Sequence, residues 1–581
     1  MPHPRRPAVF GRRFAHDLWR LTRIYWTTPD AKRGALLFAL AIVLELGTVY
    51  GNFLISDAER RIFDALADKQ IAAFFAAIGL FLGVGLLLVL GSTYRIYVRQ
   101  LLEVRWRRGV TAHYLERWMS ARAYCQAELH GSELDNPDQR IAEDARDFAA
   151  SVLGLSLSLL SAVATLLSFG GLLWTLSAHF PLRVGSTEGW VPGLMLWVAL
   201  AYASLSMWLT HLMGRRLVPL NFDRMRFEAD FRYGLVHFRD NVEAVTLARG
   251  ETLERLGALE RFRRIVKNWR KLIRAQRNLT LLTGGIGQAN GLVPLLVAAP
   301  AFFAGHLTLG GIAQVRFAYG QVSGALSWFI HAYQEIARWR ANIERLGSFA
   351  EVMDKTEEKL EQAGIHVVPT ERPSLLIRDL ELKTPDGNVF LERANAVIEA
   401  GERVAITGPS GSGKTMLLRA IAGIWPFGNG RIEVPARTHM LFLPQHPYLP
   451  LGSLRAALSY PAPEGTFTDD QICEVLQLLG LERLTTRLAD VEPWDQWLST
   501  NEQQRVALAR VFLNKPEWVF LDRATSALDD ATEKRVYALL AEHLPRSTLI
   551  SVAYRPEVAG YHVRRWSLAP REGGPAVLLS T

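Results

Sequence analysis

Cysteine is scarce in this sequence, and the pattern of a cleavable leader is absent from it. Of the 581 residues only Cys125 and Cys473 are cysteine, too few to indicate a disulfide framework or a metal cluster. The N-terminal residues lack the short apolar core and small-residue cleavage site of a secretory signal. No internal repeat or low-complexity tract is present. We therefore expect the first apolar run to be a membrane anchor that stays with the chain.

The net charge is +9, with 49% of the residues apolar and 21% charged. A positive excess can indicate nucleic-acid binding, but most of the surplus arginine lies beside apolar runs and not in a basic patch studded with aromatic residues. Arginine beside apolar runs is typical of membrane topology. The charge therefore favours an integral membrane protein over a nucleic-acid-binding one.

Long apolar runs are concentrated between residues 34 and 335. A helix that crosses a hydrocarbon core of ~30 Å takes roughly 20 residues. We predict six transmembrane helices, at about residues 34–55, 72–97, 149–177, 188–213, 279–305 and 311–335. The sixth contains the polar residues Arg316, Gln321, His331 and Gln334, so it should face a cavity or a neighbouring helix.

Basic residues predict a cytoplasmic N-terminus. Those before the first apolar run are Arg5, Arg6, Arg12, Arg13, Arg20, Arg23, Lys32 and Arg33. By the positive-inside tendency, this end and the arginine-rich stretches at 98–148 and 214–278 lie in the cytoplasm. The shorter and less basic loops near 56–71, 178–187 and 306–310 then lie outside. An even number of spans returns the chain to the cytoplasm before its C-terminal part.

The chain divides into a membrane part and a soluble part. Residues 1–33 are predicted to form a cytoplasmic N-terminal segment and residues 34–340 an all-α, polytopic membrane domain. Residues 341–372 are charged, helix-prone and end in prolines, which is typical of a linker. From 373 to 581 short β-like runs and turn residues predict an α/β domain.

A glycine-rich segment carries the clearest chemistry. It follows an apolar strand at 403–406 and precedes an apolar helix at 416–424, the context that a phosphate-binding loop requires. Glycines let backbone N–H groups turn towards phosphates, Lys414 reaches the terminal phosphates, and Thr415 can ligate Mg²⁺. The residues predicted to bind ATP here are Gly408, Pro409, Ser410, Gly411, Ser412, Gly413, Lys414 and Thr415.

Further motifs follow in a fixed order: Gln445, then residues 498–505, then a strand ending at Asp522, then residues 549–555. This order resembles the nucleotide-binding domain of an ABC transporter, with its Walker A (P-loop), Q-loop, signature, Walker B, D-loop and switch region. The resemblance implies that Asp522 and Gln445 act at Mg²⁺ with Thr415. It also implies that Gln445 senses the membrane domain and that Asp529 lies in the D-loop. By the same resemblance, Ser499 would contact the γ-phosphate from the opposite subunit.

Several departures from this family pattern affect hydrolysis. Arg523 stands where such cassettes carry the glutamate that activates water, and a guanidinium cannot accept a proton. Tyr554 replaces the expected switch histidine, and Thr500 and Asn501 take both glycine positions of the signature. Because loss of general-base help costs ~10²–10⁴ in rate, we predict ATP binding with weak or very slow hydrolysis.

The adenine-stacking aromatic of the family is also missing, because Thr384 occupies its approximate place. Phe390 is a possible substitute, but an ordinary core phenylalanine is the favoured interpretation. The residue that stacks on adenine is therefore left unassigned.

The cytoplasmic stretches of the membrane half resemble the SbmA/BacA-type membrane domain. The segments that carry this resemblance lie at 103–108, 114–118, 135–144, 228–233 and 239–251. Fused to a C-terminal cassette, such a domain is typical of bacterial ABC proteins related to the peroxisomal ABCD half-transporters. Their relatives move peptides, cobalamin or other large hydrophilic molecules. Taken alone, these charged helical stretches predict a surface that holds the cassette against the spans.

Glu45 lies in the middle of the first predicted span. An ionisable group at that depth costs ~2.5–3.5 kcal/mol on insertion scales, so we predict that it faces a membrane cavity. The alternative is a carboxylate satisfied by a neighbouring helix. Gln288, Asn290 and His331 could share such a cavity, although interhelical hydrogen bonding is the favoured role of each.

One membrane domain with one cassette is half of a transporter, because this architecture holds ATP between the phosphate loop of one cassette and the signature of another. The resemblance implies a homodimer in the bacterial inner (plasma) membrane that binds Mg²⁺-ATP and moves a peptide-like or other bulky polar solute. The alternative is a nucleotide-binding, hydrolysis-deficient subunit, which is regulatory in a heterodimer or driven by protons. The long uncharged runs argue against a soluble ATPase.

Overall fold

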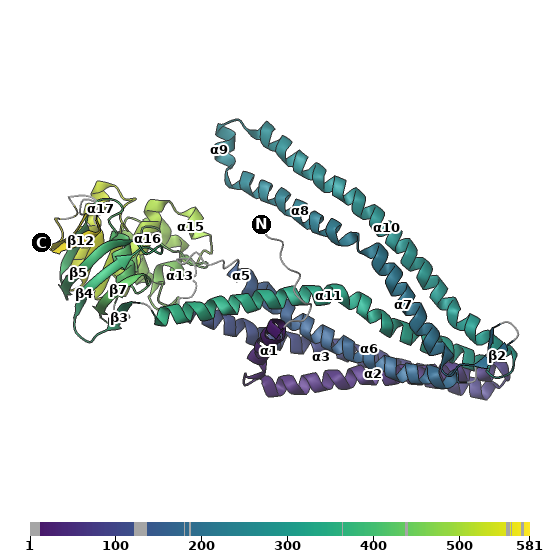
Figure 1. Cartoon of the computed structure of the whole chain (residues 1–581). Coiled ribbons are helices and arrows are strands. Elements are labelled where there is room, and N and C mark those ends of the chain that lie inside the picture. The colour runs from purple at the N-terminus through teal and green to yellow at the C-terminus, as the bar shows by residue number, and fades with distance from the viewer. Residues whose placement is uncertain are drawn as a thin grey trace. The chain divides into compact units, whose positions relative to one another are not determined.

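The computed structural model describes residues 12–120, 136–178, 181–184, 187–362, 364–435, 440–552, 558, 560–570 and 574–580 (Figure 1). The chain forms two compact units. The first comprises Met1–Leu115 and Asn136–Phe349, and the second comprises Glu116–Asp135 and Ala350–Thr581. The division agrees with the expected combination of a helical membrane region and an α/β domain.

The first unit is built almost entirely of helices. They are α1 (Arg12–Trp26), α2 (Ala31–Ala67), α3 (Ile71–Ser120), α5 (Pro137–Gln139), the π-helix η1 (Arg140–Asp144), α6 (Ala145–Leu176), α7 (Leu194–Gly214), α8 (Leu217–Asp240), α9 (Val242–Leu247), α10 (Glu251–Phe303) and α11 (Leu309–Glu361). The last residues of α3 and of α11 belong to the second unit. A small hairpin of β1 (Pro181–Val184) and β2 (Thr187–Trp190) precedes α7.

Among the described residues, 5 helical stretches are long and apolar enough to cross a membrane. They are Ala31–Ala67, Ile71–Met119, Pro137–Leu176, Leu194–Asp240 and Glu251–Phe303, and each overlaps one of the first five predicted spans. The sixth predicted span lies within α11, which is one continuous helix. Its membrane crossing, and with it the count of six, stays a prediction.

The fourth predicted span begins later than the sequence indicated. Residues 187–190 form β2, and the helix starts only at Leu194. Gly193 adopts a left-handed conformation with φ of 67°, which glycine tolerates without steric cost. This glycine and Pro192, which directly precedes it, separate strand from helix, so the prediction of a helix from residue 188 was wrong.

The predicted outer loop at 56–71 is largely helical, because α2 continues to Ala67. Its charged residues pair along the helix: Asp57 accepts hydrogen bonds from Arg60 at 2.8 Å and from Arg61 at 2.7 Å. Pairs at these spacings stabilise a helix. The segment that was expected to form a loop therefore continues the helix beyond the apolar run, and its ion pairs support the added turns.

The core of the first unit is formed where four helices meet. Phe169 and Leu173 of α6 pack with Met195 of α7, Ala298 of α10 and Tyr319 of α11, and all five are buried. These residues lie in the apolar runs that predicted spans three to six. The predicted spans therefore pack on one another across long sequence distances.

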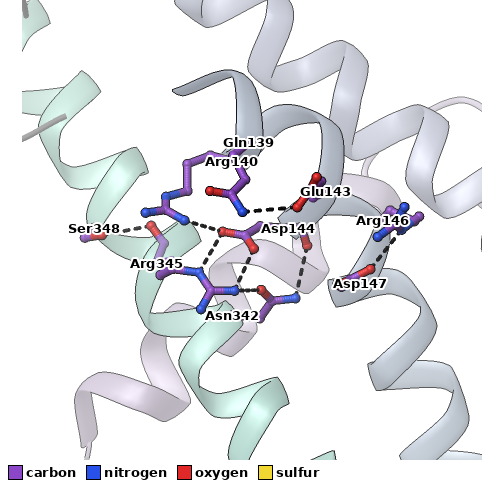
Figure 2. Close-up of polar contacts among 9 residues, drawn as sticks. All are labelled: Gln139, Arg140, Glu143, Asp144, Arg146, Asp147, Asn342, Arg345 and Ser348. Atoms are coloured by element: carbon purple, nitrogen blue, oxygen red, sulfur yellow. Dashed lines mark hydrogen bonds and ion pairs between the residues drawn. The ribbon is translucent and has the colours of Figure 1, made fainter. Parts of the chain in front are cut away.

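A polar network joins η1 to α11 (Figure 2). The Asp144 side chain, 4% exposed, accepts hydrogen bonds from Arg345 and from Arg140 Nη1, the latter at 2.9 Å. Asn342 donates to the Asp144 carbonyl at 3.3 Å and accepts a hydrogen bond from Arg345. Two guanidinium groups therefore balance one buried carboxylate, as a buried charge requires.

The second unit contains a 10-stranded sheet among the described residues, in the order β3-β7-β4-β5-β12-β11-β6-β10-β9-β8. Its strands are β3 (Ile365–Pro369), β4 (Ser374–Lys383), β5 (Val389–Glu399), β6 (Arg403–Thr407), β7 (Gly428–Val434), β8 (Met440–Leu443), β9 (Trp518–Asp522), β10 (Thr548–Val552), β11 (Arg564–Pro570) and β12 (Ala576–Ser580). Strand β3 pairs with β7, so part of the predicted 341–372 linker belongs to the sheet, and the rest continues α11 to Glu361.

Helices complete the second unit. They are α12 (Lys414–Ile421), α13 (Leu454–Ser459), α14 (Asp469–Leu478), the 3₁₀ helix η3 (Glu482–Arg487), α15 (Trp494–Trp497), α16 (Thr500–Asn514) and α17 (Asp530–His543). One buried cluster packs α12 against the sheet, and a second surrounds α16, which is buried along most of its length. The sheet therefore holds α12 firmly at the carboxyl end of β6.

Candidate nucleotide-binding site

The carboxyl ends of three parallel strands, β6, β10 and β9, define the site. In the sheet register Ile406 of β6 lies opposite Val552 of β10, which lies opposite Asp522 of β9. The glycine-rich loop leaves β6 two residues after Ile406 and enters α12 at Lys414. The loop and Asp522 therefore share one edge of the sheet, where open α/β sheets bind their ligands.

The loop has the backbone of a phosphate cradle. Gly408, Gly411 and Gly413 have φ of 142°, 81° and 91°, a region that other residues rarely adopt. A Cβ at Gly413 would lie 2.6 Å from the ring of Phe390, and one at Gly408 would lie 2.7 Å from the Leu568 carbonyl oxygen. The conformation and the close packing both require glycine at these two positions.

Lys414 lies within the loop that it is predicted to serve. It is 3% exposed, and its Nζ donates hydrogen bonds to the carbonyl oxygens of Gly408 at 2.8 Å and Pro409 at 2.7 Å. Burial lowers the pKa of Lys414, and the nearby Arg523 guanidinium lowers it further. The ammonium group is thus held at the centre of the cradle, beside a second cation.

Asp522 and Thr415 face each other as a metal-binding pair would. The Thr415 hydroxyl donates to Asp522 Oδ1 at 3.1 Å. Burial raises the pKa of Asp522, while the Thr415 hydrogen bond and the positive charges of Arg523, Arg419 and Lys414 oppose that rise. A hydroxyl and a carboxylate oxygen at one point fit the oxygen ligands that Mg²⁺ prefers. The donor set therefore fits the metal, whereas the cationic neighbour at 523 does not favour it.

Arg523 begins the turn that follows β9. Its φ is 53°, an uncommon left-handed conformation for a residue with a side chain. Its carbonyl accepts a hydrogen bond from the Ser526 N–H at 3.1 Å, and the buried Thr525 hydroxyl donates to Glu533 at 2.6 Å. The turn is thus held in place directly after the unusual residue, and such conformations are common at functional sites.

Gln504 connects three of the predicted motifs, a role that the sequence did not reveal. Its side chain, on a residue 1% exposed, donates to the Gln445 carbonyl at 2.9 Å and to Ser526 Oγ at 3.2 Å. Its Oε1 accepts from the Ala527 N–H at 2.9 Å, and Asn501 Nδ2 donates to the Ala527 carbonyl at 3.2 Å. The Q-loop, signature helix and D-loop are therefore tied together. The signal in the sequence that could have indicated this role was a glutamine, Gln504, on a nearly all-apolar face of the helix.

The predicted signature serine caps its own helix. Ser499 is the N-cap of α16, where its hydroxyl and the Glu502 side chain form a capping box. Asp529 is the N-cap of α17, and its side chain accepts a hydrogen bond from the Thr532 N–H at 2.7 Å. Both residues thus stabilise helix starts, and the contact of Ser499 with a second subunit stays a prediction.

The remaining predicted site residues stand as follows. Gln445 is half-buried and is held through its carbonyl, as described above. Tyr554 lies outside the described residues. Phe390 packs against Gly413 and forms an edge contact with Trp425 at a centroid distance of 6.4 Å. This packing accords with the favoured core interpretation of Phe390.

Glu45 is paired with a residue of the next helix. It is 5% exposed, and its Oε2 accepts a hydrogen bond from Arg95 Nη1 at 3.0 Å. This contact favours the alternative that a neighbouring helix satisfies the carboxylate, and the cavity role of Glu45 stays a prediction. The signal missed in the sequence was Arg95, a lone basic residue near the end of the second predicted span, which could have been recognised as a partner for Glu45.

Comparison with known families supports this assignment of parts. The family described as ABC transporter transmembrane region 2 matches residues 21–303, and the family described as ABC transporter matches residues 391–526. The second match begins in β5 and ends in the turn after β9, so it contains the phosphate loop and Asp522.

Relatives resemble the chain over nearly its whole length. An uncharacterized ABC transporter ATP-binding protein of Synechocystis is 36% identical, over 92% of this chain and 81% of its own. The inner membrane ABC transporter ATP-binding protein YddA of Escherichia coli is 32% identical, over 94% of this chain and 95% of its own. A more distant relative, the human lysosomal cobalamin transporter ABCD4, is 25% identical over 96% of this chain and 95% of its own.

Proposed function

This chain belongs to the ABC transporters, as a half-transporter with fused membrane and ATPase domains, and from that premise we propose that it moves a bulky polar or peptide-like solute across a bacterial inner membrane. Two relatives support the finer terms of the proposal. The name of YddA places that protein in an inner membrane, and the name of the human relative assigns it cobalamin, a bulky polar solute. Residues 1–33, which precede the membrane domain at 34–340 in the sequence, then lie in the cytoplasm. The ATP-binding domain from 373 to 581, which follows it, lies there too.

The observation that carries the ATP-binding part of the proposal is the arrangement at the edge of the sheet. The loop at 408–413 has the positive φ values of a phosphate cradle, Lys414 lies inside it, and Thr415 meets Asp522 at 3.1 Å. Backbone N–H groups at a helix start attract phosphate, and the lysine adds charge. When Mg²⁺ arrives with the nucleotide, Thr415 and Asp522 would hold it and Gln445 would be its third contact.

The way the family divides its ATP site between two cassettes supports a dimer. The phosphate loop and the signature of one chain lie on different elements, and the Ser499 hydroxyl is engaged with Glu502 of its own helix at 2.8 Å. In the family, the signature of a second cassette completes the ATP site. We propose a homodimer, with a heterodimer beside an intact half-transporter as the alternative.

A second candidate function keeps the fold but removes fast hydrolysis. The observation that favours it is Arg523, whose guanidinium acts on both Lys414 and Asp522 and cannot serve as a general base. In the sequence, Tyr554 replaces the switch histidine, and this replacement also favours slow hydrolysis. In this candidate the chain binds ATP and changes state without cleaving it at a useful rate.

Nucleotide binding and turnover separate these possibilities. The purified full-length chain in detergent is tested for binding of a fluorescent ATP analogue and for Mg²⁺-dependent phosphate release, beside Lys414→Ala and Arg523→Glu. Binding that Lys414→Ala abolishes supports the proposed site, and no binding at all contradicts it. Turnover at ordinary transporter rates in the unmodified chain contradicts the second candidate, whereas turnover that appears only in Arg523→Glu supports it.

A further inference from the structure

The charge at the nucleotide site differs from that of a site built to use magnesium. Lys414, Asp522 and Arg523 together carry one positive charge. With a glutamate at position 523, the same three positions would carry one negative charge. A bound Mg²⁺ would then be needed to reach the single positive charge that this chain already has. A triphosphate is highly anionic, so the sign of this local charge decides how strongly it is attracted.

The position of Arg523 brings its charge to the phosphates. It follows Asp522 directly, at the sheet edge that also holds the glycine-rich loop, and Asp522 is hydrogen-bonded to the first turn of α12 through Thr415 at 3.1 Å. The turn after β9 is fixed by the Ser526 N–H contact with the Arg523 carbonyl at 3.1 Å. Arg523 therefore sits on an anchored backbone at the sheet edge that holds the cradle.

The electrostatic effect of Arg523 on its neighbours shows the same proximity. Its charge lowers the pKa of Lys414, after the larger effect of burial, and it opposes the burial that raises the pKa of Asp522. Both residues are positioned for the terminal phosphates. The charge of this half-buried guanidinium acts on both of them, and it therefore also acts on an anionic ligand bound between them.

We propose that Arg523 takes over the charge role of magnesium, so that this chain does not require a divalent cation to bind ATP, although Thr415 and Asp522 can still hold one. Guanidinium groups donate paired hydrogen bonds to phosphate oxygens and stay charged at every physiological pH. The same side chain that removes the general base thereby supplies an anchor for the metal-free triphosphate. The inference rests on the proposed binding of ATP at the phosphate loop, and it specifies the form in which the nucleotide is bound.

The test compares nucleotide affinity with and without magnesium. Trinitrophenyl-ATP is titrated into the purified full-length chain in detergent, once with excess Mg²⁺ and once with EDTA. The two Kd values should agree within about threefold in the unmodified chain. In Arg523→Glu, Kd in EDTA should rise by at least about tenfold, the scale of one charge-assisted contact, and added Mg²⁺ should restore it. Arg523→Gln, neutral and similar in size, should weaken binding in EDTA by less.

A matched control removes the effect of overall charge. Arg546 is exposed and follows α17, so Arg546→Glu changes the net charge equally while leaving both Kd values as they were. A requirement for Mg²⁺ of tenfold or more in the unmodified chain would overturn the inference, as would an Arg523→Glu variant with the metal dependence of the unmodified chain. Absence of binding under both conditions would instead overturn the proposed function. Thermal unfolding without nucleotide confirms that each variant is folded.

Discussion

Arg345 donates two hydrogen bonds to the carboxylate of Asp144, from Nε to Oδ2 at 2.8 Å and from Nη2 to Oδ1 at 2.6 Å. The Asp144 side chain is 4% exposed and that of Arg345 is 42% exposed. A two-point contact of this kind fixes the relative position of η1 and α11 (Figure 2). The segment 135–144, which carries part of the family resemblance, thus ends in a structural anchor.

Asp144→Asn should destabilise the membrane unit. The variant removes the carboxylate that Arg140 and Arg345 both contact, and hydrogen bonds to charged groups contribute ~1.5–3 kcal/mol each, less here because Arg345 is partly solvated. The unfolding temperature of the chain in detergent should fall by several degrees. Asp147→Asn is the control, because its pair with Arg146 is about half exposed on both sides, and it should change little. Equal effects of the two variants would contradict the anchor.

Gly413→Ala should abolish nucleotide binding, and Gly411→Ala should weaken it less. Both glycines have positive φ, so an alanine is strained at either position, by roughly 1–2 kcal/mol. Only at Gly413 does the new Cβ also meet a ring, that of Phe390 at 2.6 Å, whereas nothing lies within 4 Å at Gly411. Fluorescent-nucleotide titration ranks the two variants.

Replacing the Phe390 ring with a smaller side chain should restore part of the nucleotide affinity that Gly413→Ala loses. In the double variant Gly413→Ala with Phe390→Leu, the clash is removed and only the backbone strain is left. Its affinity should approach that of Gly411→Ala. A double variant as weak as Gly413→Ala alone would show that packing against Phe390 does not shape the loop.

The nucleotide site was predictable because its signal is local, and the contacts that support it were not. A strand, a glycine-rich loop and a helix are adjacent in sequence. The placement of Lys414 and Thr415 at the start of that helix therefore follows from their spacing alone. Asp144 and Arg345 are 201 residues apart, and Glu45 and Arg95 are 50 apart. Such pairs depend on how the helices pack. The same holds for β3, whose pairing with β7 no local pattern in the predicted linker indicates.

Gln504→Glu should loosen the D-loop without changing the size of the side chain. The carboxylate still accepts from the Ala527 N–H, but it cannot donate to the Gln445 carbonyl or to Ser526. Leaving a buried carbonyl opposite an acceptor costs ~1–3 kcal/mol. We expect a lower unfolding temperature and weaker nucleotide binding. Gln477→Glu, on the exposed face of α14, serves as the control and should shift stability by less than about 0.5 kcal/mol.

His562 should make the stability of the chain fall on mild acidification. Burial lowers its pKa from the ordinary 6.5, against the opposing contact of Nδ1 with the Val558 carbonyl at 3.0 Å. Because the unfolded state binds the proton more tightly, stability is complete above pH 6.5 and declines as the pH falls from there to the lowered pKa. Thermal unfolding across this range should show a shallower decline in His562→Gln. The exposed His366→Gln should keep the original slope.

A charge swap tests whether Glu45 is a structural partner or a cavity residue. The Glu45 side chain is 7% exposed and that of Arg95 is 32% exposed, at 3.0 Å from each other. Glu45→Arg places two cations together and Arg95→Glu two anions, and breaking a buried pair costs ~3–5 kcal/mol. Both single variants should lose most of the monodisperse protein in size-exclusion chromatography. The double variant, Glu45→Arg with Arg95→Glu, should recover it, because the pair is restored with its direction reversed. If the double variant stays as unstable as the singles while Glu45→Gln remains well folded, the ion pair does not hold α2 to α3, and the carboxylate serves the cavity role that the sequence first predicted.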